Sequence, residues 1–231
     1  MTRQLIDDIM PHFDVAASYG IDVAAPPSIA YAAISQADFS RSTTIRVLMS
    51  LRRGKPLKDS RSGSWRERLQ ESSFIELAES PDRELVLGIV GKFWRPDGGA
   101  CSKMTPQEFH EFSRPEFARA AWNFAVTEKS QNSSRMTTET RIQCLGRTAR
   151  WRFRSYWLIV GPFSGLIRKV MLRQIKIEAE RRFSAQSHGS VSDSADRVLE
   201  QMMRTEPPSD AGLLRFRILS RERNADKLRV L

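Results

Sequence analysis

The chain has 231 residues and a formal net charge of +10, and 40% of its residues are hydrophobic. That is enough apolar material for one large domain, or for one medium domain with a tail. The two cysteines, Cys101 and Cys144, form no Cys-x-x-Cys pair, which excludes a disulfide framework and argues against a structural zinc site. Asp7 and Asp8 stand where an export signal needs apolar residues, and no apolar run reaches membrane-spanning length. We therefore expect a cytoplasmic protein without a transmembrane segment.

Almost all of the net charge lies in the segment Arg147–Arg182, where ten lysines and arginines against two glutamates leave +8. Such a segment is either a solvated helix face or a contact surface for phosphates, an anionic membrane or an acidic partner. The solvated face is the simpler interpretation. We place the basic surface at Arg150, Arg154, Arg168 and Arg173.

The N-terminal third predicts a leader, one strand and three helices. Pro27 suits the first turn of a helix, because Ile29, Ala30, Ala33 and Ile34 then share one apolar face. The predicted elements are a leader at residues 1–12, a strand at Ala17–Ala24, a helix from Pro27, a helix at Thr43–Arg53, a polar loop at Lys55–Gly63 and a short helix at Trp65–Glu71.

A hairpin follows. Phe74–Glu79 and Arg83–Trp94 are β-type runs joined by the turn tripeptide Ser80-Pro81-Asp82. The second run is apolar on both faces, which predicts a long strand in a curved sheet. Thr105-Pro106-Gln107-Glu108 then has the pattern of a capping box with proline at the first helical position, so a short helix to about Phe112 is predicted.

Two further strands are predicted at Arg119–Glu128 and Ser134–Leu145, with a turn at Ser130–Ser133. In the second strand, apolar and small residues alternate with Thr137, Glu139, Arg141 and Gln143, a set that we expect to face solvent. In the first strand Asn123 falls opposite the aromatic face, so we expect it to point outward as well.

After Gly146 the apolar period changes from two residues to 3.6, which predicts a long helix through about Arg182. Gly161-Pro162 interrupts the pattern, so we expect either a kink or a break into two collinear helices. Ser184–Ser194 is predicted to be a linker, and Ala195–Arg204 a weak helix. We expect three parts: the leader at residues 1–12, a domain at residues 13–183 and a polar, weakly structured tail at residues 184–231.

This order of elements resembles the START-like superfamily, also called SRPBCC or the polyketide cyclase and lipid-transport group. The resemblance spans about Phe13–Phe183, and its motifs are unspecific as chemical signatures. Three stretches carry it: YGIDVAAPPSIAYAAIS at Tyr19–Ser35, AWNFAVTEKSQNSSRMTTETRIQC at Ala121–Cys144, and RFRSYWLIVGPFSGLIRKVMLRQIKIEAE at Arg152–Glu180, which is similar to the closing helix of some bacterial members. The tail has no counterpart in the family.

The resemblance implies an α+β, helix-grip fold, in which a curved antiparallel sheet wraps around a long C-terminal helix and leaves an apolar cavity between them. Members of the superfamily bind lipids, sterols, polyketides, quinones or hormones, and some catalyse cyclisation or hydroxylation steps.

The sequence gives no support for metal, nucleophile or phosphate-loop chemistry. His12, His110 and His188 have no partner at ligand spacing, and neither cysteine has a histidine nearby. There is no Gly-x-Ser-x-Gly, and Gly98-Gly99 lacks the lysine and the following helix of a P-loop. We therefore assign no catalytic residue, no metal and no cofactor.

The best candidates for a ligand site are aromatic and methionine side chains on elements that the fold would bring together. Pockets for small molecules are mostly apolar, with a few polar anchors, although any single residue at helical spacing is more often plain core. The candidates are Phe93, Trp122, Phe124, Met136, Tyr156, Trp157, Phe163 and Met171.

The leading hypothesis is a protein that binds a hydrophobic small molecule or lipid between the sheet and the long helix, while the basic helix docks on an anionic surface. The first alternative is a cyclase or aromatase that uses the same cavity. The second is a nucleic-acid or protein-interaction module that uses Arg147–Arg182, where Arg150, Arg152 and Arg154 interleave with aromatic residues. Nucleic acid is the less favoured partner, and the oligomeric state is left open.

Overall fold

The computed structural model describes residues 3–36, 73–95, 99, 101 and 103–204, with side chains up to residue 187. The helices predicted at Thr43–Arg53 and Trp65–Glu71 and the loop between them lie outside the described residues. The chain divides into two compact units, Met1–Ser184 and Ala185–Leu231. In the described part of the chain, no helix is both long and apolar enough to cross a membrane.

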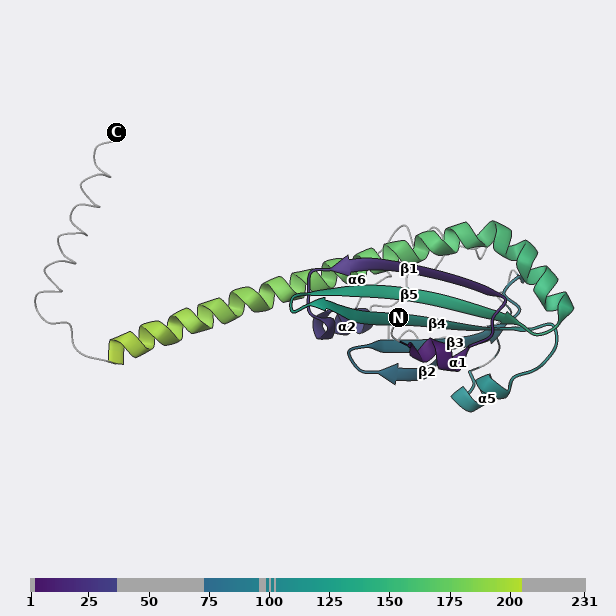
Figure 1. Ribbon diagram of the computed structural model, residues 1–231, viewed down its shortest axis with the longest axis horizontal. Coiled ribbons are helices and arrows are strands. Elements are labelled where there is room, and N and C mark those ends of the chain that lie inside the picture. Colours follow the sequence, from purple (N-terminus) through teal and green to yellow (C-terminus); the bar gives the residue numbers. More distant parts are fainter. Residues whose placement is uncertain (1–2, 37–72, 96–98, 100, 102, 205–231) are drawn as a thin grey trace, which may run out of the picture. The chain divides into compact units, whose positions relative to one another are not determined.

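Five antiparallel strands form a single curved sheet with the order β1-β5-β4-β3-β2 (Figure 1). β2–β3 and β4–β5 are hairpins, β3 and β4 pair across a longer connection at residues 92–117, and β1 pairs with β5. The turn between β2 and β3 contains Asp82 with a φ of 59°, a left-handed conformation that aspartate adopts more readily than most residues. The strands are β1 (Val15–Val23), β2 (Ile75–Ser80), β3 (Glu84–Gly91), β4 (Ala118–Ser130) and β5 (Ser133–Cys144).

Helices lie on both faces of the sheet. Residues from α6 and α2 pack on one face, the inner face, and residues from α1 and α5 on the other, the outer face. The predicted capping box at α5 is confirmed, since Thr105 Oγ1 accepts from Glu108 N (3.2 Å) and Glu108 Oε2 accepts from Thr105 N (2.6 Å). The bounds are α1 (Leu5–Ile9), α2 (Pro27–Gln36), α5 (Pro106–Glu111) and α6 (Arg147–Arg204).

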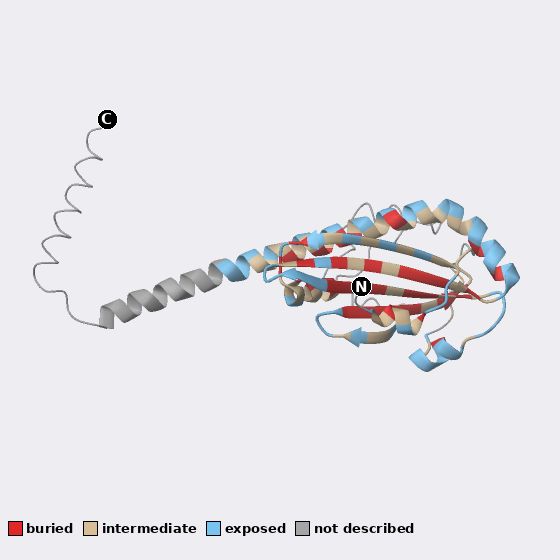
Figure 2. Cartoon of the chain, viewed as in Figure 1, coloured by how far each residue is buried: buried red, intermediate tan, exposed pale blue. Residues whose placement is uncertain are grey.

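The predicted strands and their alternation are largely confirmed. Leu85 and Leu87 of β3 lie on the inner face, and Val86 and Val90 lie on the outer face, so the strand is buried on both sides. Figure 2 shows the buried residues concentrated along β3, β4 and β5. The second strand of the first hairpin ends at Gly91, earlier than the predicted Trp94, because a turn begins at Lys92, whose carbonyl accepts from Arg95 N.

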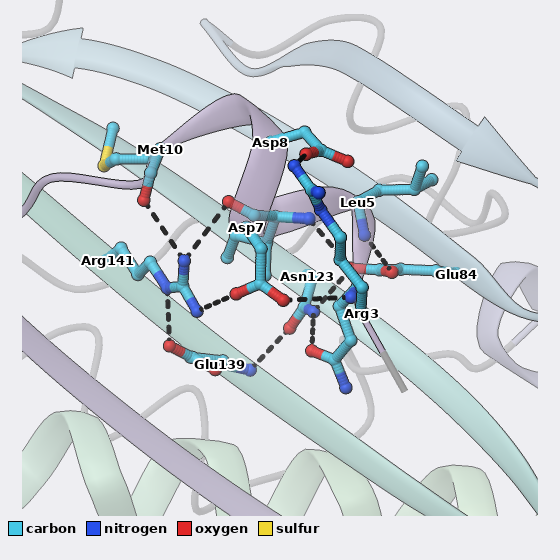
Figure 3. Close-up of polar contacts among 11 residues, drawn as sticks. Arg3, Leu5, Asp7, Asp8, Met10, Glu84, Asn123, Glu139 and Arg141 are labelled. Atoms are coloured by element: carbon cyan, nitrogen blue, oxygen red, sulfur yellow. Dashed lines mark hydrogen bonds and ion pairs between the residues drawn. The ribbon is translucent and has the colours of Figure 1, made fainter. Parts of the chain in front are cut away.

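The outer face corrects one prediction. Arg141 and Asn123, which we expected to face solvent, are 8% and 1% exposed, and Glu139 is half-buried. The reason is α1, which lies on this face and meets the polar side chains with its backbone. Arg141 Nη1 donates to the carbonyl oxygens of Ile6 (3.3 Å) and Met10 (3.1 Å) (Figure 3).

Two carboxylates complete this buried polar network. Glu84, 5% exposed, accepts from the backbone N–H groups of Leu5 (2.7 Å) and Ile6 (3.3 Å) and from Asn123 Nδ2 (2.7 Å). Asp7 Oδ1 accepts from Arg141 Nη2 at 2.6 Å. The segment predicted to be a leader is thus held to the sheet by charge-assisted hydrogen bonds, which are the stronger kind.

The long helix is continuous through Gly161-Pro162, so the predicted kink, rather than a break, is the correct alternative. Figure 1 shows α6 bending as it passes over the end of the sheet. Proline lacks an N–H to donate and its ring crowds the carbonyl four residues earlier, which accounts for a bend. The helix also runs through Ser184–Ser194, where the sequence predicts a linker.

Together these elements give the α+β class expected from the sequence, with a curved antiparallel sheet on one long C-terminal helix.

Candidate functional site

The candidate site is the interface between α6 and the inner face of the sheet. Two apolar clusters fill its ends. The α2-side cluster joins Met171, Leu172 and Ile175 of α6 to Phe124 and Met136 of the sheet. The end cluster joins the start of α6 to the other end of the sheet, and its buried members are Ala118, Ala120, Ile142, Cys144, Ala149 and Phe153.

Between these clusters, α6 places an arginine against the sheet. Arg168 is half-buried, and its Nε and Nη2 donate to Thr140 Oγ1 at 3.1 and 2.5 Å. Its Nη1 donates to the carbonyl oxygen of Ser164 at 3.2 Å and to the hydroxyl of the same residue. The Arg168 Cζ atom lies 5.8 Å from the centroid of the Trp122 ring, within the range of a cation–π contact.

Strand register brings the sheet side of this polar centre together. Thr140 lies directly opposite Trp122 on β4, and Thr138 lies opposite Tyr19 on β1. Trp122 Nε1 donates to Thr138 Oγ1 (2.7 Å), which in turn donates to the Asn123 carbonyl oxygen (2.7 Å). The alternation of β5 therefore places two threonines on an otherwise apolar face: Thr140 bonds to Arg168 of the helix, and Thr138 bonds within the sheet.

The helix side of the centre depends on small residues. Gly165 is buried, and a Cβ at this position would overlap the Tyr19 hydroxyl and lie 3.0 Å from Tyr19 Cζ. Ser164 and Arg168 are four residues apart and so share one side of the helix. We call Arg168, Thr140, Thr138, Trp122 and Ser164 the Arg168 centre.

A tyrosine adds a second polar group nearer the start of α6. Tyr156 packs in the end cluster, with its ring centroid 5.9 Å from that of Phe153. Its hydroxyl is buried and has no hydrogen-bond partner among the residues described, and the same holds for Gln174 Oε1. An unsatisfied buried hydroxyl costs about 1–3 kcal/mol, a cost that a polar atom bound beside it would remove.

The structure places seven of the eight aromatic and methionine candidates in two groups, and the eighth, Phe163, belongs to neither. Phe163 is 45% exposed on the surface of α6. The other seven divide between the α2-side cluster, with Trp122, Phe124, Met136 and Met171, and the end cluster, with Phe93, Tyr156 and Trp157.

Of the four arginines predicted to form the basic surface, three are exposed and one is half-buried. Arg154 and Arg173 are exposed, as is Arg150, whose Nε bonds to Asp14 Oδ1 at 2.6 Å. Arg168 instead points to the sheet. Its direction had a signal in the sequence, because it lies four residues before Leu172 and seven before Ile175, on the apolar side of the helix.

The cysteines offer no activated nucleophile. Burial, with the negative charge of Asp14 next in importance, raises the pKa of the Cys144 thiol to about 12, and burial also raises the pKa of Cys101. A thiol needs a lowered pKa to attack at neutral pH. Over the part of the chain that the structure covers, no group of three His, Cys, Asp or Glu side chains is placed to hold a metal ion.

No family model matches the chain, and no curated protein matches it. Among solved structures it is similar to CalU16 from Micromonospora echinospora, with 12% identity over 75% of this chain and 88% of that chain and a TM-score of 0.25. It is also similar to the Zhui aromatase/cyclase from Streptomyces sp. R1128, with 12% identity over 73% of this chain and 94% of that chain and a TM-score of 0.29. Similarity at this level carries no functional argument.

Proposed function

We propose that the chain binds a hydrophobic small molecule or lipid between α6 and the inner face of the sheet, with Arg168 as its polar anchor. The observation that carries the proposal is the Arg168 centre itself, a guanidinium and two threonine hydroxyls between two apolar clusters. An apolar wall with a few convergent polar groups is the usual composition of a small-molecule site.

The chemistry of the centre narrows the class of ligand. A guanidinium is permanently charged, and its planar fork matches the two oxygens of a carboxylate. Trp122 and Phe124, with ring centroids 4.8 Å apart, supply an aromatic wall beside it. We therefore favour a ligand with an apolar body and a carboxylate or a similar oxygen-rich group.

Ligand binding is tested first on the freshly purified full chain by native mass spectrometry, and then by thermal shift with fatty acids, aromatic acids and their neutral amides. We expect a co-purified ligand or a rise in the unfolding temperature with at least one acid. The proposal is contradicted if no ligand co-purifies and neither the acids nor the amides shift the transition.

The role of Arg168 is tested by Arg168→Gln. We expect the affinity for the acid to fall by about tenfold or more, because a hydrogen bond to a charged group contributes roughly 1.5–3 kcal/mol, while the affinity for the neutral amide changes little. Arg173→Gln is the matched control, since Arg173 is exposed on the same helix. Equal losses for the acid and the amide would remove Arg168 as the anchor.

A cyclase-type reaction on the same ligand is the second candidate. The observation that favours it is the buried Tyr156 hydroxyl, which is suited to donate a proton to a carbonyl oxygen. Mass analysis of the bound compound after prolonged incubation distinguishes the two candidates, since a binding protein returns its ligand unchanged.

A further inference from the structure

The start of α6 exposes large apolar side chains along one side. Trp151, Leu158 and Ile159 are 72%, 81% and 71% exposed, and Phe163 and Leu166 are 45% and 46% exposed. They are seven, one, four and three residues apart along the chain, and at 100° per residue they share one broad side of the helix. We call these five residues the apolar stripe. Figure 2 shows the exposed residues along this part of α6.

Cations border the stripe, and anions are absent from its segment. Residues 147–177 contain six arginines and two lysines but no aspartate or glutamate. Arg147, Arg152 and Arg154 pair with no carboxylate among the described residues, whereas Arg150 bonds to Asp14. A hollow in the surface here is lined by Arg147, Thr148, Arg150, Trp151 and Arg154.

In water, without a partner, these charges and apolar side chains destabilise the start of α6. The first turn of α6 holds no acidic residue, although the N-terminal end of a helix carries a partial positive charge and is stabilised by anions. Arginines at this end add like charge, and the stripe leaves apolar surface in water. Both unfavourable features would be relieved by one partner that is anionic at its surface and apolar beneath.

Three kinds of partner differ in how well they fit. A second copy of the chain would cover the stripe, but it would bring two rows of arginines together. Nucleic acid would satisfy the arginines, but Leu158, Ile159 and Leu166 have no ring on which a base could stack. An anionic bilayer offers phosphates to the arginines and acyl chains to the aliphatic residues.

We propose that the N-terminal part of α6 is an interfacial helix that docks on an anionic membrane surface, inserting Leu158 and Ile159 while Arg152 and Arg154 contact lipid phosphates. A long arginine side chain can reach the head-group level while its stem lies along apolar surface. This inference goes beyond the proposed ligand site, because the stripe faces away from the sheet and membrane binding needs no bound ligand.

The test measures co-sedimentation of the full chain with phosphatidylcholine vesicles, with or without phosphatidylglycerol. We expect binding only to the anionic vesicles, and weaker binding as salt is raised, since salt screens surface charges. The double variant Leu158→Ser/Ile159→Ser should bind at least about tenfold more weakly, as expected when apolar side chains leave the membrane. Arg152→Glu/Arg154→Glu should lose about fivefold or more per arginine.

Two controls make the outcome specific. Arg83→Glu makes the same arginine-to-glutamate substitution once, at an exposed position on the β2–β3 turn, and it should leave binding nearly unchanged, whereas Arg152→Glu alone should weaken it. Binding should also move the tryptophan emission to shorter wavelength, a shift that Trp151→Phe should reduce without abolishing co-sedimentation.

The proposal is overturned if the chain fails to bind anionic vesicles at low salt, if it binds neutral vesicles equally well, or if Leu158→Ser/Ile159→Ser binds like the wild type. A dimer that the same double variant dissociates would assign the stripe to a second copy instead. Salt-dependent binding to RNA without binding to vesicles would assign the arginines to nucleic acid.

Discussion

Arg141 is the residue that most clearly joins the N-terminal segment to the rest of the molecule. Its guanidinium bonds to the carbonyl oxygens of Ile6 and Met10, to Asp7 and to Glu139 Oε1 (2.7 Å). A buried cation is tolerated only when it is paired and hydrogen-bonded, and here every arm of the guanidinium has an acceptor. The network therefore depends on the charge of its acidic partners, which pH can remove.

Asp7 provides a pH-dependent test of this network. The backbone N–H of Gln4, and then Arg141, lower the pKa of Asp7 below its ordinary value of 3.8. Because the folded-state pKa is depressed, the ionised carboxylate stabilises the fold above the unfolded pKa, and this contribution is lost as pH falls through the folded pKa. We expect Asp7→Asn to lower the free energy of unfolding by about 1 kcal/mol at pH 7 and by clearly less at about pH 2.

Urea unfolding at both pH values measures this difference. Asp8→Asn is the matched control, because the Asp8 ion pair with Arg3 is exposed at the surface and such pairs contribute little. If Asp7→Asn costs the same free energy at the two pH values, ionisation of Asp7 is not the source of its contribution.

At the residue scale, alternation in β4 and β5 predicts correctly which side chains share a face, but not what covers that face. Asn123 and Arg141 read as solvent-facing because polar residues at every second position usually are. The α1 segment that covers them lies more than a hundred residues earlier in the sequence, and its five residues carry no strong local signal. Arg168 was also assigned wrongly, to the exposed basic surface, although its spacing from Leu172 and Ile175 places it on the apolar side of the helix.

At Gly165, helix α6 lies so close to the sheet that close packing outweighs the higher helix propensity of alanine. Alanine is favoured over glycine in a helix by about 1 kcal/mol, but its Cβ at this position would overlap the Tyr19 hydroxyl. We expect Gly165→Ala to lower the free energy of unfolding by about 1–2 kcal/mol, as measured by urea denaturation.

Repeating Gly165→Ala in a Tyr19→Leu background tests whether overlap with Tyr19 causes the loss of stability. With the overlapping ring and hydroxyl removed, Gly165→Ala should become neutral or stabilising by up to about 1 kcal/mol, because helix propensity then dominates. A stabilising effect of Gly165→Ala in the wild-type background would show that the helix can move away from β1 at no cost.

At the element scale, the sequence predicted elements correctly where turn residues, capping residues or a change of hydrophobic period mark their ends. The turn at Asp82, the capping box of α5 and the change of period at Gly146 each marked an element that the structure contains. Pro162 left open a kink or a break into two helices, because proline removes the same backbone hydrogen bond in either case. The structure decides between them, because one continuous helix contains Pro162, with Phe153 before it and Met171 after it on the inner face of the sheet.

The contacts of the whole chain divide after Ser184, and Ala179 is the last residue of α6 within the α2-side cluster's buried set. We propose that the stable domain ends near Phe183, which is half-buried against that cluster. A chain that ends at Ser184 should therefore unfold in one cooperative transition, with a midpoint within about 5 °C of the full chain, a shift equivalent to about 1 kcal/mol or less. Calorimetry of the two chains measures this, and loss of the cooperative transition would place the boundary later.

For the whole molecule, the order of elements was enough to predict an α+β fold with one long helix on an antiparallel sheet. The identity of a ligand was not predictable, since aromatic residues at helical or strand spacing fill cores and line pockets alike. The two apolar clusters and the polar centre between them emerge only when register and helix position are combined, as at Thr140, Trp122 and Arg168.

The crossover of β1 to β5 also has a consequence for how the chain folds. Val15 pairs opposite Ile142, so this edge of the sheet can form only after most of the domain has been synthesised, whereas the β2–β3 and β4–β5 hairpins can form locally. Closing so long a loop carries an entropic cost that slows folding. During translation the backbone of β1 therefore stays unpaired until β5 has been synthesised. In this interval the nascent chain is most exposed to aggregation or to chaperone binding.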